Sequence, residues 1–171
     1  MKQAIHLLAL VFCAAPSPVV AESGARVAFE QLKGLAGDWR SEKQGNATVV
    51  NYAVIANGTT VVENWTMSPT LRSMTVYTLD GDRLIATHYC PQGNAPRLQW
   101  MRTDADGTHR FEFVDGANLQ DPSGSHEHAF RMRIDASGTL RRSEVYIRND
   151  AAYDAQRDVG DTASFVRVPD A

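Results

Sequence analysis

The sequence is poor in cysteine: its 171 residues contain only Cys13 and Cys90. Cys13 lies in an N-terminal segment that we expect to be removed from the mature protein. The mature chain then keeps a single cysteine, which excludes an internal disulfide. An unpaired cysteine in an oxidising compartment is buried and inert, bound to a ligand, or reactive, so Cys90 is a candidate functional residue.

Long hydrophobic runs are absent beyond the N-terminus. No later stretch approaches the roughly 20 apolar residues that a membrane-spanning helix needs. The first residues fit a secretory signal peptide, with Lys2 as its positive start, an apolar run over residues 4–15 and small residues at 19–21. We therefore expect residues 1–21 to be a cleaved signal peptide. The mature protein is then periplasmic or secreted, with one domain over residues 22–171.

The chain has no block of like charge, and its formal net charge is −3. Interspersed acidic and basic residues argue against nucleic acid or an anionic membrane as the main partner. The sequence also lacks the Gly-x-Ser-x-Gly motif, a phosphate-binding loop and a dinucleotide fingerprint. No local motif identifies a nucleophile, so a binding protein is favoured over an enzyme.

Short runs rich in Val, Thr, Tyr, Phe and Trp make up most of the chain after Trp39. Turn dipeptides separate them at Asn57-Gly58, Asp80-Gly81, Asp106-Gly107, Asp115-Gly116 and Ser137-Gly138. Asn, Asp and Gly favour the positive φ angles of tight β-turns, so these dipeptides predict hairpins. One helical pattern precedes them, in which Val27, Leu32 and Leu35 can share a face, with Phe29 nearby, before Gly34 and Gly37 end it.

The runs predict a series of antiparallel strands. Their expected ranges are 39–43, 47–56, 59–67, 71–79, 83–90, 97–103, 108–114, 126–135, 139–148 and 163–168. Sequential hairpins of this number usually close, because closure removes exposed strand edges. We therefore expect an all-β fold, an antiparallel meander closed into a lipocalin-like barrel of about 8 to 10 strands with one short N-terminal helix.

The alternation of side chains along each strand predicts which of them face the interior. His126 and His128 share a face with Phe130, whereas Glu127 and Arg131 occupy the opposite face. The same rule places Glu63 on one face with Val61 and Trp65, which makes Glu63 a candidate interior carboxylate. The alternation does not decide whether His88 and Cys90 point inward.

The motifs taken together resemble a known group. The Gly-x-Trp sequence at residues 37–39, after a helix, is similar to the start of calycin-type barrels, which include the lipocalins. Further shared features are Tyr77-x-Leu-Asp-Gly-Asp-Arg-Leu84, Thr87-His-Tyr-Cys90, Phe111-x-Phe113 and His126-x-His128. From about Phe29 to Ile147 the chain resembles exported bacterial proteins of unknown function with a lipocalin-like, DUF1579-like barrel. The resemblance implies a barrel and a bacterial envelope location, and implies no activity.

Our first functional interpretation is a barrel that binds a small, partly apolar ligand in its interior, since such sites combine apolar walls with a few polar groups. The candidate ligand-binding residues are Glu63, Trp65, His88, Tyr89, Trp100, His126, His128 and Phe130. The same aromatic residues could instead form a filled core, which would make the protein a structural or interaction barrel.

A metal site is the alternative. His88, Cys90, His126 and His128 offer imidazole and thiolate groups, which together suit zinc or copper. Such a site could serve a metal-dependent enzyme or a metal-binding protein. The spacing is not one of the specific zinc signatures, so a polar cluster without metal is favoured.

Overall fold

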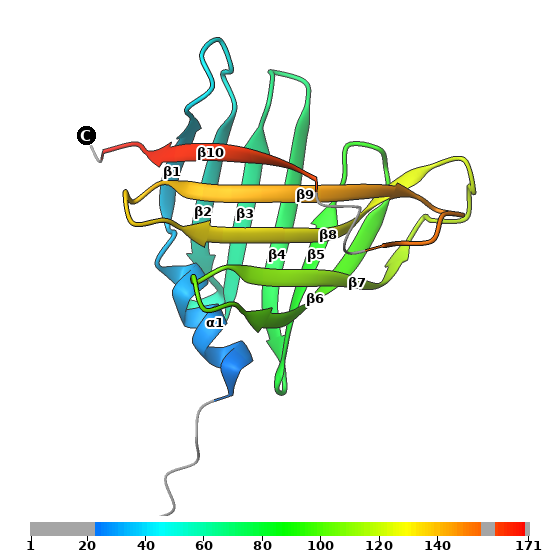
Figure 1. Cartoon of the computed structure of the whole chain (residues 1–171), viewed down its shortest axis with the longest axis horizontal. Helices are drawn as coiled ribbons and strands as arrows, with labels where there is room; N and C mark the ends of the chain where they lie inside the picture. Colours follow the sequence, from blue (N-terminus) through cyan, green and yellow to red (C-terminus); the bar gives the residue numbers. More distant parts are fainter. Residues whose placement is uncertain (1–22, 155–159, 170–171) are drawn as a thin grey trace, which may run out of the picture.

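The protein forms a closed barrel of ten antiparallel strands, seen here in a computed structural model that describes residues 23–154 and 160–169 (Figure 1). Each strand pairs with its neighbours in the sequence, and β1 also pairs with β10 to close the barrel. The strands are β1 Gly37–Ser41, β2 Val49–Ile55, β3 Thr60–Thr66, β4 Arg72–Asp80, β5 Arg83–Tyr89, β6 Ala95–Thr103, β7 His109–Ala117, β8 Ser125–Ile134, β9 Leu140–Arg148 and β10 Asp161–Arg167. The predicted all-β barrel is confirmed. The predicted signal peptide lies outside the described residues.

Four of the five predicted turn dipeptides connect strands. Gly81, Gly107 and Gly138 have φ angles of 61°, 83° and 80°, which side chains with a Cβ atom rarely adopt. Asn57-Gly58 belongs to a short 3-10 turn, η1 Ala56–Gly58, between β2 and β3. Turn chemistry therefore identified these strand boundaries.

The prediction of a turn at Asp115-Gly116 is wrong, because both residues lie within β7 and pair with β6. Gly116 faces Pro96, and a Cβ atom on Gly116 would lie 2.8 Å from the Pro96 Cα atom. The glycine thus permits two backbones to approach closely, which is a second use of glycine in strands.

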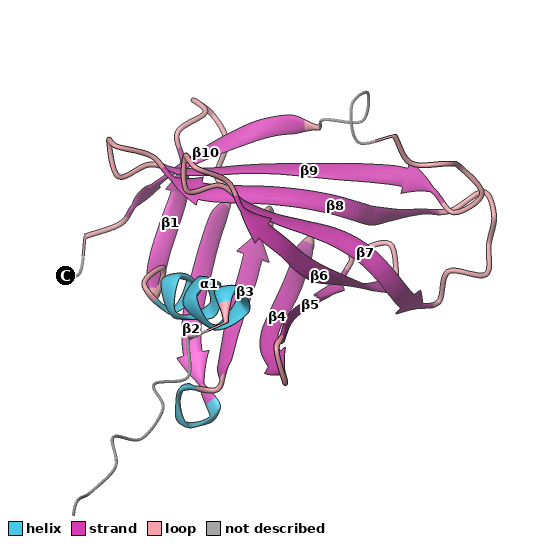
Figure 2. Cartoon of the chain, turned by 60° about the horizontal axis from the view of Figure 1, so that its bottom comes forward, coloured by secondary structure: helices cyan, strands magenta, loops and turns pink. Residues whose placement is uncertain are grey.

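The single α-helix among the described residues, α1 Gly24–Lys33, lies across one end of the barrel (Figure 2). Ser23 caps its N-terminus, and the helix buries Ala25, Ala28, Phe29 and Leu32. Val27, which we expected on the buried face, is exposed, because the buried face is set by residues 25, 28, 29 and 32. None of the helices in the described residues has the length and apolar character needed to cross a bilayer.

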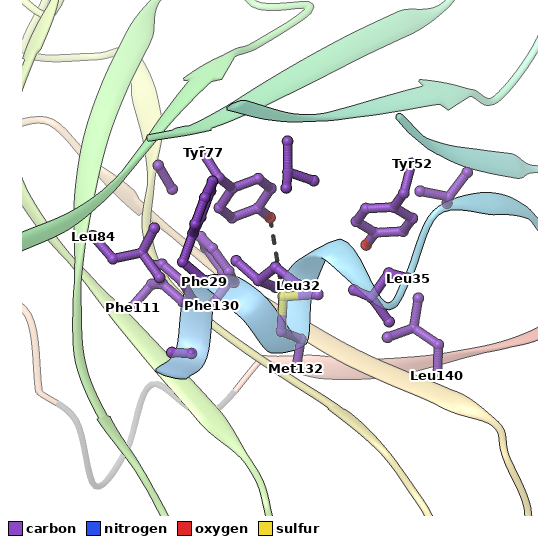
Figure 3. Close-up of a cluster of buried hydrophobic side chains, with 14 of the residues drawn as sticks. Phe29, Leu32, Leu35, Tyr52, Tyr77, Leu84, Phe111, Phe130, Met132 and Leu140 are labelled. Carbon is purple, nitrogen blue, oxygen red and sulfur yellow. Dashed lines mark hydrogen bonds between the residues drawn. The ribbon is translucent and has the colours of Figure 1, made fainter. Parts of the chain in front are cut away.

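The hydrophobic core is concentrated around this helix. Figure 3 shows Phe29, Leu32 and Leu35 of the α1 region packed among side chains from the barrel wall. The wall residues labelled there are Tyr52, Tyr77, Leu84, Phe111, Phe130, Met132 and Leu140. We call this region the apolar half of the barrel interior.

The strands change character as they leave the apolar half. Along β5 the interior side chains run from Leu84 to His88, along β8 from Met132 to Glu127, and along β9 from Leu140 to Glu144. The same strands that supply the apolar core therefore carry ionisable groups away from α1. These groups form the candidate site.

Candidate functional site

A β-bulge in β8 determines which of its side chains enter the interior. Glu127 pairs with Tyr146 and Ala129 with Val145, so His128 is an extra residue in β8 relative to β9. An extra residue reverses the alternation of side chains along the strand. Our prediction that Glu127 faces outward is therefore wrong: its side chain is 0% exposed and contacts Arg142 inside the barrel.

Arg142 lies at the centre of the buried ionisable groups and is 1% exposed. Its Nη1 atom lies 3.3 Å from Glu63 Oε2, its Nη2 atom 3.4 Å from Glu127 Oε1, and its Nε atom 2.7 Å from Glu144 Oε1. Burial by itself lowers the pKa of Arg142, but Glu63 and its other negative neighbours raise that pKa well above the usual range. The guanidinium is therefore charged and held by three carboxyl groups.

Glu63 is the interior carboxylate that the strand pattern predicted. The indole N–H of Trp65 and the hydroxyl of Tyr77 both donate hydrogen bonds to its carboxylate. The Arg142 guanidinium also lies over the Phe130 ring, 4.2 Å from its centroid, and 5.6 Å from that of Trp65. Aromatic rings and charged groups thus meet in one place.

His88, whose direction the sequence left open, points into the interior. Its Nδ1 atom lies 3.0 Å from Thr75 Oγ1, and its Nε2 atom 3.4 Å from the Tyr146 hydroxyl. Burial, together with the positive charge of Arg142, lowers the pKa of His88 to about 4. The imidazole is therefore neutral at neutral pH.

The second carboxyl oxygen of Glu127 has no hydrogen-bond partner among the described residues. This Oε2 atom is buried and lies 3.7 Å from His88 Nδ1, beyond hydrogen-bond distance. Burial, reinforced by the nearby negative charge of Glu144, raises the pKa of the Glu127 carboxyl well above its usual range. We call Glu63, Tyr77, His88, Glu127, Arg142 and Glu144 the interior polar cluster.

The interior polar cluster reaches solvent at one edge. The Glu144 side chain is 29% exposed, and Tyr146, which covers His88, is 38% exposed. Cys90 lies beside them and is buried, and burial raises the pKa of its thiol. A raised pKa disfavours the reactive thiolate form, so Cys90 is not an activated nucleophile.

His126 and His128 form a separate pair. The Nε2 atom of His126 lies 3.0 Å from His128 Nδ1, and its Nδ1 atom lies 2.7 Å from Asn149 Oδ1. Phe113 packs against both imidazoles, and Tyr153 packs against His128. Pairing between β7 and β8 stops at Glu112 and Ala129, just before this pair.

The four residues of the hypothetical metal site thus fall into two groups. His88 and Cys90 lie beside Tyr146, whereas His126 and His128 contact Phe113 and Asn149. Within residues 23–154 and 160–169, no group of three or more His, Cys, Asp or Glu side chains is arranged to hold a metal ion.

The other predicted ligand-binding residues have different environments. Tyr89 is 48% exposed at the end of β5, whereas Phe130 is fully buried in the core. Trp100 is partly buried and packs against the start of α1, where a Cβ atom on Gly24 would lie 2.8 Å from its ring. Of the predicted set, Glu63, Trp65, His88 and Phe130 lie in or against the interior polar cluster.

Sequence reasoning missed Arg142, Glu127 and Tyr146. The alternation Leu140-x-Arg142-x-Glu144-x-Tyr146 places all four on one face of β9, so a buried leucine at its start could have indicated an interior arginine. Glu127 was missed because nothing in the local sequence indicates the bulge.

No protein-family model matches this chain, and no curated protein is significantly similar to it.

Proposed function

We propose that the protein binds a small, partly apolar ligand at the interior polar cluster, through the edge formed by Glu144 and Tyr146. The observation that carries this proposal is the Oε2 atom of Glu127, which has no hydrogen-bond partner within residues 23–154 and 160–169 and belongs to a side chain that is 0% exposed. Leaving a buried polar atom without a hydrogen bond costs about 1 to 3 kcal/mol. A ligand group that donates a hydrogen bond to this oxygen would remove that cost.

Stability alone does not explain the cluster. Replacement of buried ion pairs by well-packed apolar residues is often neutral or stabilising. Buried ionisable groups with strongly shifted pKa values gather at functional sites more often than elsewhere. Both arguments support a role for the cluster in binding.

The charges of the cluster favour a ligand with donor groups. Three carboxyl groups surround one guanidinium, so acidic groups outnumber cationic ones in the cluster, and an ammonium group beside Glu127 would lower the raised pKa of that carboxyl and favour its ionised, acceptor form. Trp65 and Tyr146 add aromatic surface beside the carboxyl groups. An amine joined to an apolar group matches both features, because ammonium groups bind carboxylates and aromatic faces.

Export to the periplasm or the exterior remains part of the proposal and rests on the N-terminal sequence. Membership of the DUF1579-like group is likewise a proposal, which the barrel fold supports without identifying the family.

Isothermal titration with two probes of matched size tests the proposal. 2-Phenylethylamine should bind the wild-type protein, whereas 3-phenylpropionate should not. Glu127→Gln should weaken binding of the amine at least tenfold, the scale of one lost charge-assisted hydrogen bond. His126→Gln, a substitution in the separate histidine pair, is the matched control and should leave binding unchanged.

Two outcomes would overturn the proposal. If neither probe binds, the filled barrel becomes the better interpretation. About one zinc or copper ion per chain, found by elemental analysis without a metal-binding tag and lost in His126→Gln/His128→Gln, would favour the metal-dependent alternative.

A further inference from the structure

The outer face of the barrel carries three pairings of arginines across neighbouring strands, the first between Arg102 of β6 and Arg110 of β7. Arg110 of β7 is opposite Arg131 of β8, and Arg133 of β8 is opposite Arg141 of β9. Like charges directly opposite one another destabilise a sheet. We call these five residues the arginine face.

Acidic side chains pair with four of the five arginines. Asp104 pairs with Arg102 and Arg110, and Asp106 lies 3.5 Å from Arg133. Arg141 pairs with Asp135 at 2.8 Å and Glu42 at 3.8 Å. Among the described residues, Arg131 has no acidic oxygen within ion-pair distance, although it lies at the middle of the face.

The arginine face is hollowed by two grooves that share Arg110 and Arg131. The larger has a volume of about 400 Å³ and is also lined by Arg133, Arg141, Thr108 and Thr162. The smaller, about 210 Å³, is lined by Arg102, Glu112 and Tyr153 in addition to the shared pair. The larger volume lies in the range of small-molecule sites, about 300 to 1,000 Å³.

We propose that the larger groove binds a small molecule that carries two phosphate groups. Arginine binds phosphate through two parallel N–H donors, and a phosphate close to a doubly charged state offers more negative charge than a carboxylate. One phosphate would lie between Arg110 and Arg131, and the other between Arg133 and Arg141. The hydroxyls of Thr108 and Thr162 offer further donors.

The spacing of the two arginine pairs favours two anionic groups over one. Arg131 and Arg133 are two residues apart on β8, so their Cα atoms are separated by about 7 Å. A molecule with a single phosphate can engage one pair only. The proposed phosphate contacts come from outward-facing side chains; Met132 and Arg142 also border the groove but belong to the interior, and Arg142 is only 1% exposed.

Calorimetric titration with two sugar phosphates tests the proposal. Fructose 1,6-bisphosphate should bind at least tenfold more tightly than fructose 6-phosphate. Arg131→Gln should weaken binding of the bisphosphate at least tenfold, because it removes the arginine that forms no ion pair with another described residue. Arg72→Gln makes the same charge change on β4, far around the barrel, and should leave binding unchanged.

Thermal unfolding will show that both variants fold, since each changes an outer side chain. Glu127→Gln should not alter bisphosphate binding, which separates this test from that of the interior site. If both sugar phosphates bind equally weakly, and binding falls equally in Arg131→Gln and Arg72→Gln, the proposal is overturned. Diffuse positive charge on the surface would then explain the binding. Sedimentation with phosphatidic acid vesicles, without bisphosphate binding, would overturn it in favour of a membrane surface.

Discussion

The two halves of the barrel interior are built on the same strands, but burial of their side chains affects the stability of the fold differently. The apolar half packs α1 against side chains such as Leu84 and Phe111, and each such burial stabilises the fold by about 1.5 to 3 kcal/mol. The other half buries Arg142 with Glu63 and Glu127, and each ion loses several kcal/mol of hydration.

The difference indicates that burial in the apolar half, more than the ion pairs of the polar half, stabilises the closed barrel. Every strand pairs with two neighbours, but the pairing is interrupted around the polar half, because β7 and β8 stop pairing at Glu112 and Ala129 and β8 is bulged at His128. The apolar half therefore stabilises the fold, whereas burial of the ions in the polar half lowers the net stability. This division of roles can be tested by substitution in each half.

Substitution of the central cation should have the largest effect. Arg142→Met leaves Glu63 and Glu127 without their buried positive partner, and we expect a loss of about 3 to 5 kcal/mol in the free energy of unfolding, measured with urea. Addition of Glu63→Gln and Glu127→Gln should recover most of this loss. A single variant as stable as the wild type would contradict the view that the carboxyl groups depend on Arg142.

Truncation in the apolar half should cost slightly less. Leu84→Ala removes a fully buried side chain beneath α1, and we expect a loss of about 2 to 5 kcal/mol from lost burial and the cavity that remains. The exposed Leu71 provides the control, since Leu71→Ala should change stability by less than about 0.5 kcal/mol. No additional substitution in the polar half should rescue Leu84→Ala, in contrast to Arg142→Met.

The same comparison explains what the sequence could predict. Turn dipeptides and alternating side chains located all ten strands, because hairpins depend on local backbone chemistry. Glu63 was predicted as an interior carboxylate because β3 pairs with both neighbours without a bulge over that region. Local patterns were therefore sufficient wherever the ladder is regular.

The polar half was harder to predict because its geometry is not local. One extra residue at His128 turns Glu127 inward, and no residue type in β8 marks that bulge. Arg142 and Glu63 are far apart in the sequence and meet only when the barrel closes. The bulge at His128 therefore places Glu127 in the candidate site and also explains why the sequence did not predict Glu127 there.

The pH dependence of stability should distinguish the two halves as well. His88 has a folded pKa of about 4, below its usual value of 6.5, so between these values the unfolded chain binds a proton that the folded protein does not. Stability therefore falls as the pH is lowered through this window, by up to about 3 kcal/mol for this residue. His88→Gln should remove that part of the slope in urea unfolding measured from pH 7 to pH 4.

The matched variant for this experiment is His109→Gln at the edge of the apolar half. Burial also lowers the pKa of His109, so its loss of stability has the same direction and is also reached as the pH falls. If the slope is unchanged in His88→Gln and reduced in His109→Gln, the acid sensitivity arises in the apolar half, and the prediction for His88 is contradicted.

The smallest expected effect concerns the N-terminal cap of α1. The Ser23 side chain accepts a hydrogen bond of 3.4 Å from the Arg26 amide, so Ser23→Ala should lower stability by about 1 kcal/mol or less, whereas Ser23→Asp should keep the cap. Hydrogen exchange should quicken in α1 and not at the β8 amides around Glu127, because the helix packs on the apolar half alone. Binding of 2-phenylethylamine should be equally unaffected. Faster exchange in both places would show that the two halves open as one cooperative unit, in which case the helix also supports the polar cluster.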